Sequence, residues 1–544
     1  MINKLFNQHQ VSLALIGLLA LAGCVSKDDP PTRQVSSSAS SVASSASSTS
    51  SSSPNGNAWT QGVFPPADQF VNRCENPRSG IAPYNGQPYP DEQGTFIDEN
   101  NFLRSVSNDL YLWYDEITDR NPMLYTTPNY FDLLKTNQLT PTGAAKDQFH
   151  WSEPTAQNLA RSEGGVSAGY GIRWALLSAV PPREAVVVYT EPGSPADEAG
   201  IERGARVQKI NGVDLVGDNT NAGIDTLNEG LYPSELGVTF EFEILDLNAD
   251  TPRTVSLTTE QVNIAAVQDN KVIETPTGKV GYMVFNAHIA PAEAALKVAI
   301  EQMETDGASD LILDLRYNGG GFLYIASQLG YMIAGSQSNG AIFDNLEFND
   351  KHPTHDPVTN APLEPEPFYN TTLQGNSLPT LNLSRVFVLA GGGTCSASEA
   401  IINALGGIDV EVILIGNATC GKPYGAYMLH NCGASYYTTQ FRGSNDKGWG
   451  DYSDGFFPGN PGSSNPAELA GCQVNDDFNN LLGDPNEARL AAALYYRENG
   501  SCPAGTVPEK TSRGAQQKAQ NAARADGFIY HPPGLGDKIM RAPQ

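Results

Sequence analysis

The stretch RVFVLAGGGTCSASE, residues 385–399, joins an apolar run to three glycines and then to small polar residues. An uninterrupted apolar run is typical of a strand that is buried on both faces of a sheet. The glycines permit a sharp turn, and we expect a helix to begin at or near Ser396. A serine hydroxyl there lies at the positive end of the helix dipole, which stabilises developing negative charge.

The same serine also fits a structural role. Serine is a common residue at the start of a helix, and Ser396 with Glu399 matches the S-x-x-E pattern of a capping box. This segment by itself therefore does not distinguish a catalytic serine from a capping serine.

The following segment favours catalysis. An apolar run at 410–415 opens into GNATCGK, which ends at Lys422. Poor solvation at the end of a buried strand favours the neutral form of an amine, and a neutral amine can accept the proton of a serine hydroxyl. The interval from Ser396 to Lys422 has room for one helix, one turn and one strand, so both side chains can reach the same edge of a sheet.

Further strands and helices alternate along the same part of the chain. The expected strands are 280–285, 311–315, 385–390 and 410–415, and the expected helices are 291–303, 322–334 and 396–405. Continuous apolar strands between helices predict an α/β fold, a sheet covered by helices. Two long segments rich in glycine, asparagine and proline, 336–383 and 426–484, are expected to be loops or lids.

Two smaller domains are expected before this core. Residues 60–160 predict a mostly helical leading domain, with a helix that Asp98 caps. Its apolar positions recur at helical spacing, at Phe102, Val106, Leu110, Trp113 and Ile117. Residues 161–262 consist of short β runs separated by glycine turns.

The second of these domains resembles a PDZ domain of the kind found in bacterial proteases. Residues 185–213 follow its order of strand, short capped helix, tight turn, strand and Asn-Gly turn. The resemblance implies that Gly169, Tyr170, Gly171 and Ile172 form the loop that binds a peptide carboxylate, beside a strand that accepts an extended peptide. The alternative is a small β-domain without a ligand.

Three motifs of the chain resemble the signatures of the carboxy-terminal processing, or tail-specific, serine proteases. They are DLRYNGGG at 314–321, SASE at 396–399 and Gly421-Lys422, in the order of that family, and the similarity covers about residues 100–500. The resemblance implies a ClpP/crotonase-like α/β protease core over 263–505. It also implies a serine endopeptidase that cleaves unfolded or C-terminally tagged proteins. Because no segment has the spacing of a metal-binding motif, we expect no required metal or cofactor.

The same resemblance assigns the roles of the site residues. Ser396 is the expected nucleophile and Lys422 the expected general base of a Ser-Lys dyad. The backbone amides of Ala397 and Gly320 are the expected oxyanion hole, since glycines after Asn318 let the main chain approach an oxyanion closely.

The chain departs from the family pattern after the lysine. Many members have a glutamine that orients the lysine where this chain has Ala426, and Pro423 and Tyr424 also differ from the usual small residues. The alternative function therefore stays open: a peptide-binding lipoprotein with a PDZ-like domain and with weak or no catalysis.

The amino terminus predicts export and a lipid anchor. Lys4 precedes a short apolar stretch, 11–22, and the sequence LAGC that ends at Cys24 resembles the lipobox of bacterial lipoproteins. We expect a signal peptide at 1–24, acylation of Cys24 and a serine-rich flexible tether at 25–59. Val25 favours the outer membrane, facing the periplasm. Residues 506–544 are expected to form a C-terminal extension.

The charge of the chain and the context of two further motifs argue against nucleic-acid binding, an esterase-type hydrolase and nucleotide binding. With 33 basic and 60 acidic residues, the formal charge of −27 repels nucleic acid. The G-x-S-x-G match at 165–169 runs into a predicted strand, whereas a hydrolase elbow runs into a helix. The 416–422 match to a nucleotide-binding loop has Pro423 in place of the hydroxyl that binds Mg²⁺. The histidines are scattered and match no motif.

Six cysteines remain after Cys24, and an oxidising compartment favours disulfides among them. Six cysteines allow 15 full pairings. Nearness in sequence favours Cys420 with Cys432 and Cys472 with Cys502, and a disulfide or a packing role is expected for Cys395. The absence of a C-x-x-C pair removes support for a zinc site. The oligomeric state stays open.

Overall fold

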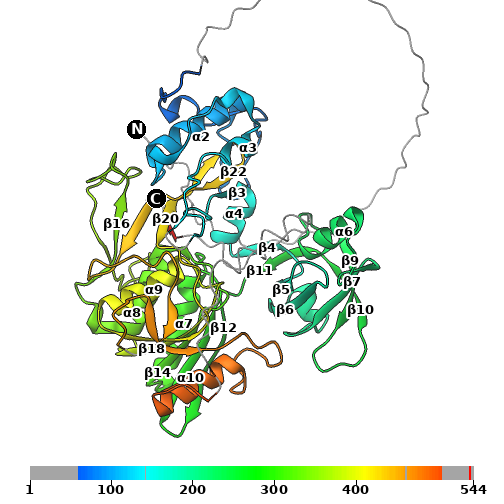
Figure 1. The fold of residues 1–544 in the computed structure, drawn as a ribbon, viewed down its shortest axis with the longest axis vertical. Helices are drawn as coiled ribbons and strands as arrows, with labels where there is room; N and C mark the ends of the chain where they lie inside the picture. Colours follow the sequence, from blue (N-terminus) through cyan, green and yellow to red (C-terminus); the bar gives the residue numbers. More distant parts are fainter. Residues whose placement is uncertain (1–58, 141–142, 460–461, 505, 507–537, 541–544) are drawn as a thin grey trace, which may run out of the picture.

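The computed structural model describes residues 59–140, 143–459, 462–504, 506 and 538–540. Figure 1 shows a leading segment around helix α2, a small β-domain with strands β5 to β10, and a larger α/β core. The expected signal peptide, Cys24 and nearly all of the tether and of the C-terminal extension lie outside the described residues. Among the helices that the structure describes, none is both long enough and apolar enough to span a bilayer.

The core is built on a seven-stranded sheet in the order β12-β13-β14-β18-β19-β25-β24. All neighbours are parallel except β12, which is antiparallel to β13. The strands are β12 (Val267–Thr275), β13 (Gly278–Phe285), β14 (Asp310–Asp314), β18 (Arg385–Ala390), β19 (Glu411–Gly416), β24 (Phe457–Gly459) and β25 (Glu468–Gln473).

Helices cover both faces of this sheet. One face packs on α7 (Ala292–Asp306), α8 (Leu323–Ala334) and α9 (Ala397–Gly407), and the other on α10 (Ala488–Asn499). Central strands are therefore apolar on both sides, which is why they appear in the sequence as continuous hydrophobic runs. The α/β prediction is confirmed, and each predicted strand and helix of the core lies within three residues of an observed one.

The two segments predicted as loops contribute most of a second sheet. Its order is β15-β26-β20-β23-β16-β17. The strands are β15 (Gly321–Phe322), β16 (Ile342–Phe348), β17 (Glu366–Pro367), β20 (Tyr424–Tyr427), β23 (Phe441–Ser444) and β26 (Lys538–Met540). β26, from the far end of the chain, is parallel to both of its neighbours, β15 and β20.

The leading segment is less helical than predicted. Helix α2 (Phe96–Leu110) begins after Thr95, whose hydroxyl accepts the Asp98 amide while the Asp98 carboxylate accepts the Thr95 amide. The predicted cap at Asp98 is therefore wrong by three residues, because a capping box places the acidic residue in the first turn. The chain turns extended at Tyr111, so Trp113 and Ile117 lie beyond the helix.

Much of the leading segment is irregular apart from the short helices α3 (Thr127–Phe131) and α4 (Thr155–Ser162). It is also tied to the core, since β3 (Trp151–Pro154) pairs with β22 (Ala434–Tyr437), and β22 continues the hairpin from β21 (Leu429–Asn431).

The small β-domain has the predicted order of strands and helices. Its main sheet runs β10-β9-β7-β6-β5, with β8 beside β7. The elements are β5 (Ile172–Ser178), β6 (Glu184–Thr190), α5 (Pro195–Glu198), β7 (Arg206–Ile210), β8 (Val213–Asp214), α6 (Asn221–Leu231), β9 (Thr239–Leu245) and β10 (Arg253–Thr258). β4 (Val166–Gly169) pairs with β11 (Glu260–Asn263), so both ends of the domain meet where the chain enters and leaves it.

Three disulfides connect the six described cysteines. Cys472–Cys502 is confirmed, whereas the predicted Cys420–Cys432 pair is wrong. Cys420 bonds to Cys395, and Cys432 bonds to Cys74. Sequence nearness failed because the fold brings Cys74 of the leading segment, 358 residues away, to a Cα–Cα distance of 5.3 Å from Cys432. Cys395 is therefore a disulfide cysteine, as expected.

A buried carboxyl links the small β-domain to the core. Glu191, which directly follows β6, accepts hydrogen bonds from the Ala265 amide and from the Gln268 side chain, at the entry to β12. Burial raises the pKa of Glu191 from 4.5 to about 7. Between these values the folded chain keeps a proton that the unfolded chain has lost, so the free energy of unfolding falls as the pH rises from about 4.5 to about 7.

The substitution Glu191→Gln should remove this pH dependence. We expect the variant to be more stable than the wild type at pH 8 by about 1–3 kcal/mol, and nearly equal to it at pH 4.5, because the neutral amide keeps an acceptor without a buried charge. Thermal unfolding at both pH values measures the difference. The exposed Glu241 of β9 supplies the control, Glu241→Gln. A lower melting temperature of Glu191→Gln at pH 8 would contradict the assignment.

Candidate active site

The turn after β14 is held by a buried charge network at its base. The Arg316 guanidinium, fully buried, donates to Asp314, Asp476 and Glu487. Because each charge there is paired, the segment that leads into the glycines is anchored to β14 and to the start of α10. The anchor fixes the position of the next residues, Tyr317 and Asn318.

Asn318 organises the glycine turn and connects it to the helix that carries the serine. Its side-chain oxygen accepts the Gly320 amide and its side-chain nitrogen donates to the Phe285 carbonyl. Its carbonyl oxygen accepts the Cys395 amide and the Ser398 hydroxyl. The DLRYNGGG and SASE motifs, about 80 residues apart in sequence, are therefore bonded directly to one another.

His288 supports the same asparagine from the other side. Since the Asn318 side-chain oxygen already accepts the Gly320 amide, His288 Nδ1, 3.0 Å away, is the donor in their hydrogen bond. Burial lowers the pKa of His288 to about 3, so the ring is neutral. Its Nε2 is buried without a hydrogen-bond partner among the described residues. His430, by contrast, bonds to Ser435 within the β21–β22 hairpin.

Gly320 lies against the serine so closely that only glycine fits. A Cβ on Gly320 would stand 2.9 Å from the Cys395 carbonyl oxygen and 3.0 Å from both the Ala397 nitrogen and the Ser396 Cβ. Its φ of 104° is also in the region that favours glycine. The structure thus brings together Gly320, Ser396 and Ala397, three of the predicted site residues. The Gly320 amide donates to Asn318 in this arrangement.

Ser396 has the backbone and the environment of a functional residue. Its φ of 61° and ψ of −114° are strained for any residue with a Cβ. Its hydroxyl is buried and has no hydrogen-bond partner within the described part of the chain. Ser396 and Glu399 also form the capping box that the S-x-x-E pattern predicts, with the Glu399 carboxylate accepting the Ser396 amide, so the capping role is present beside the strained backbone.

Glu399 joins the serine segment to the lysine segment. One of its carboxylate oxygens, Oε2, accepts the Ser396 amide at 2.9 Å and the Lys422 amide at 2.8 Å. The other oxygen, Oε1, accepts the Thr419 hydroxyl at 2.5 Å and the Gly421 amide at 2.7 Å. Burial raises the pKa of the Glu399 carboxyl, and these hydrogen bonds oppose that shift.

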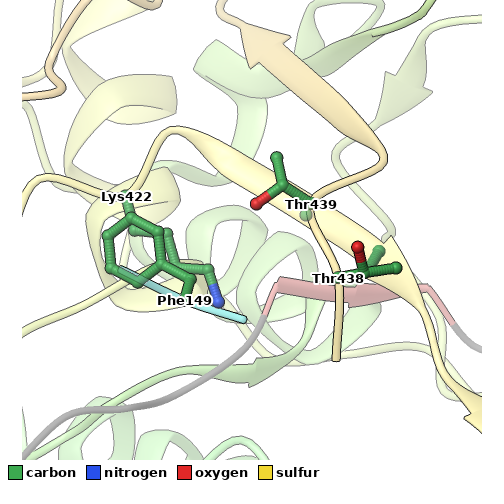
Figure 2. A pocket seen from close by; sticks show the side chains of 6 residues that line it. Phe149, Lys422, Thr438 and Thr439 are labelled. Carbon is green, nitrogen blue, oxygen red and sulfur yellow. The ribbon is translucent and has the colours of Figure 1, made fainter. Parts of the chain in front are cut away.

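The Lys422 side chain is buried and points toward the leading segment. Its amine lies 4.9 Å from the centroid of the Phe149 ring, and the two line a small pocket with Gly425, Ala426, Thr438 and Thr439. Figure 2 shows Lys422 beside Phe149, with the pale red strand β26 passing Thr438. The amine is not bonded to the Ser396 hydroxyl, since that hydroxyl has no described partner.

Two contributors to this site were not predicted from the sequence. Glu399 was considered only as a capping residue, although an acidic residue between two candidate catalytic motifs was a usable signal. Phe149 had no signal, because it is 273 positions from Lys422 and in another segment. The lysine is held by the Glu399 carboxylate at its backbone and by the Phe149 ring at its amine, where Ala426 offers no hydrogen bond.

The predicted carboxylate-binding loop lies at the start of the small β-domain. Tyr170 is buried, and its carbonyl accepts the Ala196 amide of α5. The Gly171 carbonyl accepts the Glu191 amide, and Ile172 begins β5. Gly169 ends β4, opposite Glu260 of β11. The four residues therefore connect the core side of the domain to its main sheet.

Known proteins are similar to this chain over the segment that contains Gly320, Ser396 and Lys422. Residues 279–441, which include all three motifs, match peptidase family S41. This segment is an S41 peptidase domain. The chain is 27% identical to a carboxyl-terminal-processing protease of Picosynechococcus over 49% of this chain and 57% of that protein. It is 26% identical to a chloroplastic carboxyl-terminal-processing peptidase of Arabidopsis thaliana over 41% of this chain and 43% of that protein. The chain thus spans about half the length of these relatives.

The fold is also shared with a solved structure. A putative S41 protease from Bacteroides fragilis superposes with a TM-score of 0.54 at 23% identity, over 76% of this chain and 98% of that chain. The likeness supports the mixed α/β architecture around the S41 domain. It extends beyond residues 279–441 into the flanking segments.

Strain at Ser396 gives a prediction about stability. Ser396→Gly should be at least as stable as Ser396→Ala, because relief of about 1–3 kcal/mol of backbone strain offsets the lost methyl group and the added chain entropy. Thermal melting of the two variants compares them. The control is Ala400→Gly in the same helix, where glycine should cost about 1 kcal/mol. A Ser396→Gly protein that melts well below Ser396→Ala would contradict the strain.

Proposed function

We propose that the protein is a serine endopeptidase in which Ser396 is the nucleophile and Lys422 the general base. The observation that carries this proposal is the shared acceptor: the amides of Ser396 and Lys422 bind the same oxygen of Glu399. The proposed substrates are unfolded proteins or proteins with an exposed carboxyl terminus, and the similarity to carboxyl-terminal-processing proteases supports the second of these. Hydrolysis by this route uses only side chains, backbone amides and water.

The first step is acyl transfer to the serine. Ser396 Oγ attacks the carbonyl carbon of the scissile bond, and the Lys422 amine takes the hydroxyl proton and gives it to the leaving nitrogen. For this step the amine exchanges its contact with the Phe149 ring for the serine hydroxyl. A cation–ring contact contributes about 0.5–2 kcal/mol, which is small beside a catalytic barrier.

The oxyanion forms next to the start of α9. Ala397 is the first residue of that helix, and a first-turn amide has no acceptor within its own helix. The Gly320 amide supplies a second donor when it exchanges the Asn318 side chain for the oxyanion. Water then attacks the acyl-enzyme carbonyl and its proton passes to Lys422, which gives that proton to the Ser396 oxygen as the acyl–oxygen bond breaks.

Extended substrates fit beside the site by β-addition. β26 lies between β15, which follows the glycine turn, and β20, which follows Lys422. An extended segment of the chain is thus accommodated between the two motif-bearing segments, which supports a substrate bound there through main-chain hydrogen bonds. The small β-domain is proposed to present the peptide terminus through residues 169–172, in the manner of a PDZ domain. Acylated Cys24 would hold the enzyme on the periplasmic face of the outer membrane.

A peptide-holding protein without catalysis is the alternative. The contact of the Lys422 amine with Phe149, and Ala426 in place of an orienting glutamine, favour it. The two functions differ in one measurable property, the reactivity of Ser396.

Substitution of the dyad separates the two functions. Ser396→Ala and Lys422→Met should each lower hydrolysis of an unfolded protein at least about 1000-fold without loss of the fold, and both should abolish labelling of Ser396 by a fluorophosphonate. Lys351→Met is the matched control, because Lys351 also packs on a ring, that of Tyr114. A wild-type protein that neither hydrolyses the substrate nor reacts with the probe would support the peptide-holding alternative.

Removal of β26 should leave β15 and β20 free to pair with a substrate strand. A chain that ends at Thr506 is expected to have a KM for an unfolded substrate about 3- to 10-fold lower than the full chain, with kcat within about twofold, because a competing strand held in cis is absent. Steady-state kinetics of both chains measures this. Ile539→Pro in the full chain, which disturbs the backbone pairing of β26, should act in the same direction. Equal KM values in all three proteins would contradict competition.

A further inference from the structure

A disulfide lies between the two proposed catalytic residues. It joins Cys395, the residue before Ser396, to Cys420, two residues before Lys422, with a Cα–Cα distance of 5.2 Å. Cys395 is fully buried, whereas Cys420 is only partly buried. The bond thus crosses from the nucleophile segment to the base segment.

The lysine segment has few other connections to the serine. After β19 ends at Gly416, the chain has no regular structure until β20 begins at Tyr424. Within the described contacts, the Cys420 amide donates to the Thr394 carbonyl, and three further donors of this loop bind Glu399. The disulfide is the one covalent connection of this loop to the turn before α9 among the described residues.

We propose that the Cys395–Cys420 disulfide positions Ser396 and Lys422 for catalysis, so that the peptidase is active when oxidised and weakly active when reduced. This inference rests on the proposed function. The two cysteines are positioning residues, because they act through the backbone of their neighbours. An enzyme of this kind is active in an oxidising compartment and loses activity when thiol reductants open the disulfide.

The expected loss of kcat when the disulfide opens follows from the geometry of acyl transfer. The serine oxygen, the amine and the substrate carbonyl must be aligned, and a misplacement of about 1 Å costs about 100-fold in rate. Without the disulfide the loop is held to the serine segment only by hydrogen bonds to Glu399 and Thr394, which allow such displacements more readily than a covalent bond does. Substrate binding through β-strand pairing and the small β-domain is unaffected, so kcat should change more than KM.

The reduction is a defined two-electron exchange. Dithiothreitol attacks one sulfur, the Cys395–Cys420 bond breaks, and the reagent leaves as its cyclic disulfide, while two protons complete the two cysteine thiols. The donor atoms of Cys395, Glu399 and Cys420 lie within 4.8 Å of one another, which is close enough to bind a metal once the bond is open. A chelator in every assay excludes metal capture as the cause of a loss of activity.

The experiment compares two disulfide-deletion variants of the full chain. Cys395→Ala/Cys420→Ala removes the bond at the site, and Cys472→Ala/Cys502→Ala is the matched control. The control pair has a similar separation, 30 residues against 25. Each protein is assayed for hydrolysis of an unfolded protein and for the rate of fluorophosphonate labelling of Ser396, with and without dithiothreitol.

The expected result is a loss confined to the site pair. Cys395→Ala/Cys420→Ala should have a kcat about 10- to 100-fold below that of the wild type and a KM within about threefold of it. Labelling of Ser396 should slow by about the same factor as kcat. The near-ultraviolet circular dichroism spectrum should be unchanged, which shows that the variant is folded. The control variant should keep its activity and lose it reversibly on reduction. Dithiothreitol should have no further effect on kcat of the site variant.

Three outcomes would decide against these assignments. Full activity of the site variant overturns the positioning role and leaves the peptidase function intact. Full activity of the reduced control variant does the same, provided that mass spectrometry shows an open Cys395–Cys420 bond. Inactivity of the oxidised wild type overturns the proposed function itself. If the site variant does not fold, reversible reduction of the folded control variant carries the test alone.

Discussion

The site depends on one buried carboxylate that binds donors from two distant segments. Glu399 accepts the amides of Ser396 and Lys422 on a single oxygen, and a hydroxyl and a third amide on the other. Each of these donors would otherwise be buried without a partner, which costs about 1–3 kcal/mol apiece. The same hydrogen bonds oppose the rise in the pKa of the carboxyl that burial causes. The carboxylate and the loops around it therefore stabilise one another, and neither arrangement is favourable alone.

The parallel sheet makes this arrangement possible. Strands β14, β18 and β19 end at the same edge, so the glycine turn, the serine and the lysine all emerge there. Contacts between the emerging loops then set the spacing: Asn318 bonds the turn to the residues around Ser396, and the Cys395–Cys420 disulfide bonds the serine turn to the lysine loop. Binding at the carboxyl ends of strands is a general consequence of such topology. In this protein the Cys395–Cys420 disulfide adds a covalent bond between two of the loops at that edge.

Stability and reactivity are in opposition at the serine. Ser396 has a strained backbone, and its buried hydroxyl has no described partner, both of which cost stability. A folded protein keeps a strained residue only where the surrounding structure holds it in place. Ser396 is held by the close approach of Gly320, by the hydrogen bond of its amide to Glu399 and by the disulfide of the neighbouring Cys395. The amine that would activate this hydroxyl lies on Phe149, and the Gly320 amide donates to Asn318, so the reactive state proposed above requires both groups to exchange their partners.

The sequence by itself determined the α/β core and the three motifs, because buried parallel strands and glycine turns leave strong local patterns, as in 385–399. It also indicated the order of elements in the small β-domain. Only the tertiary structure decided the disulfide pairing, the position of Phe149 over Lys422, the dual role of Glu399 and the strands within the segments expected to be loops. These depend on contacts between residues far apart in the chain, such as Cys74 with Cys432, and local periodicity carries no information about which distant segments meet.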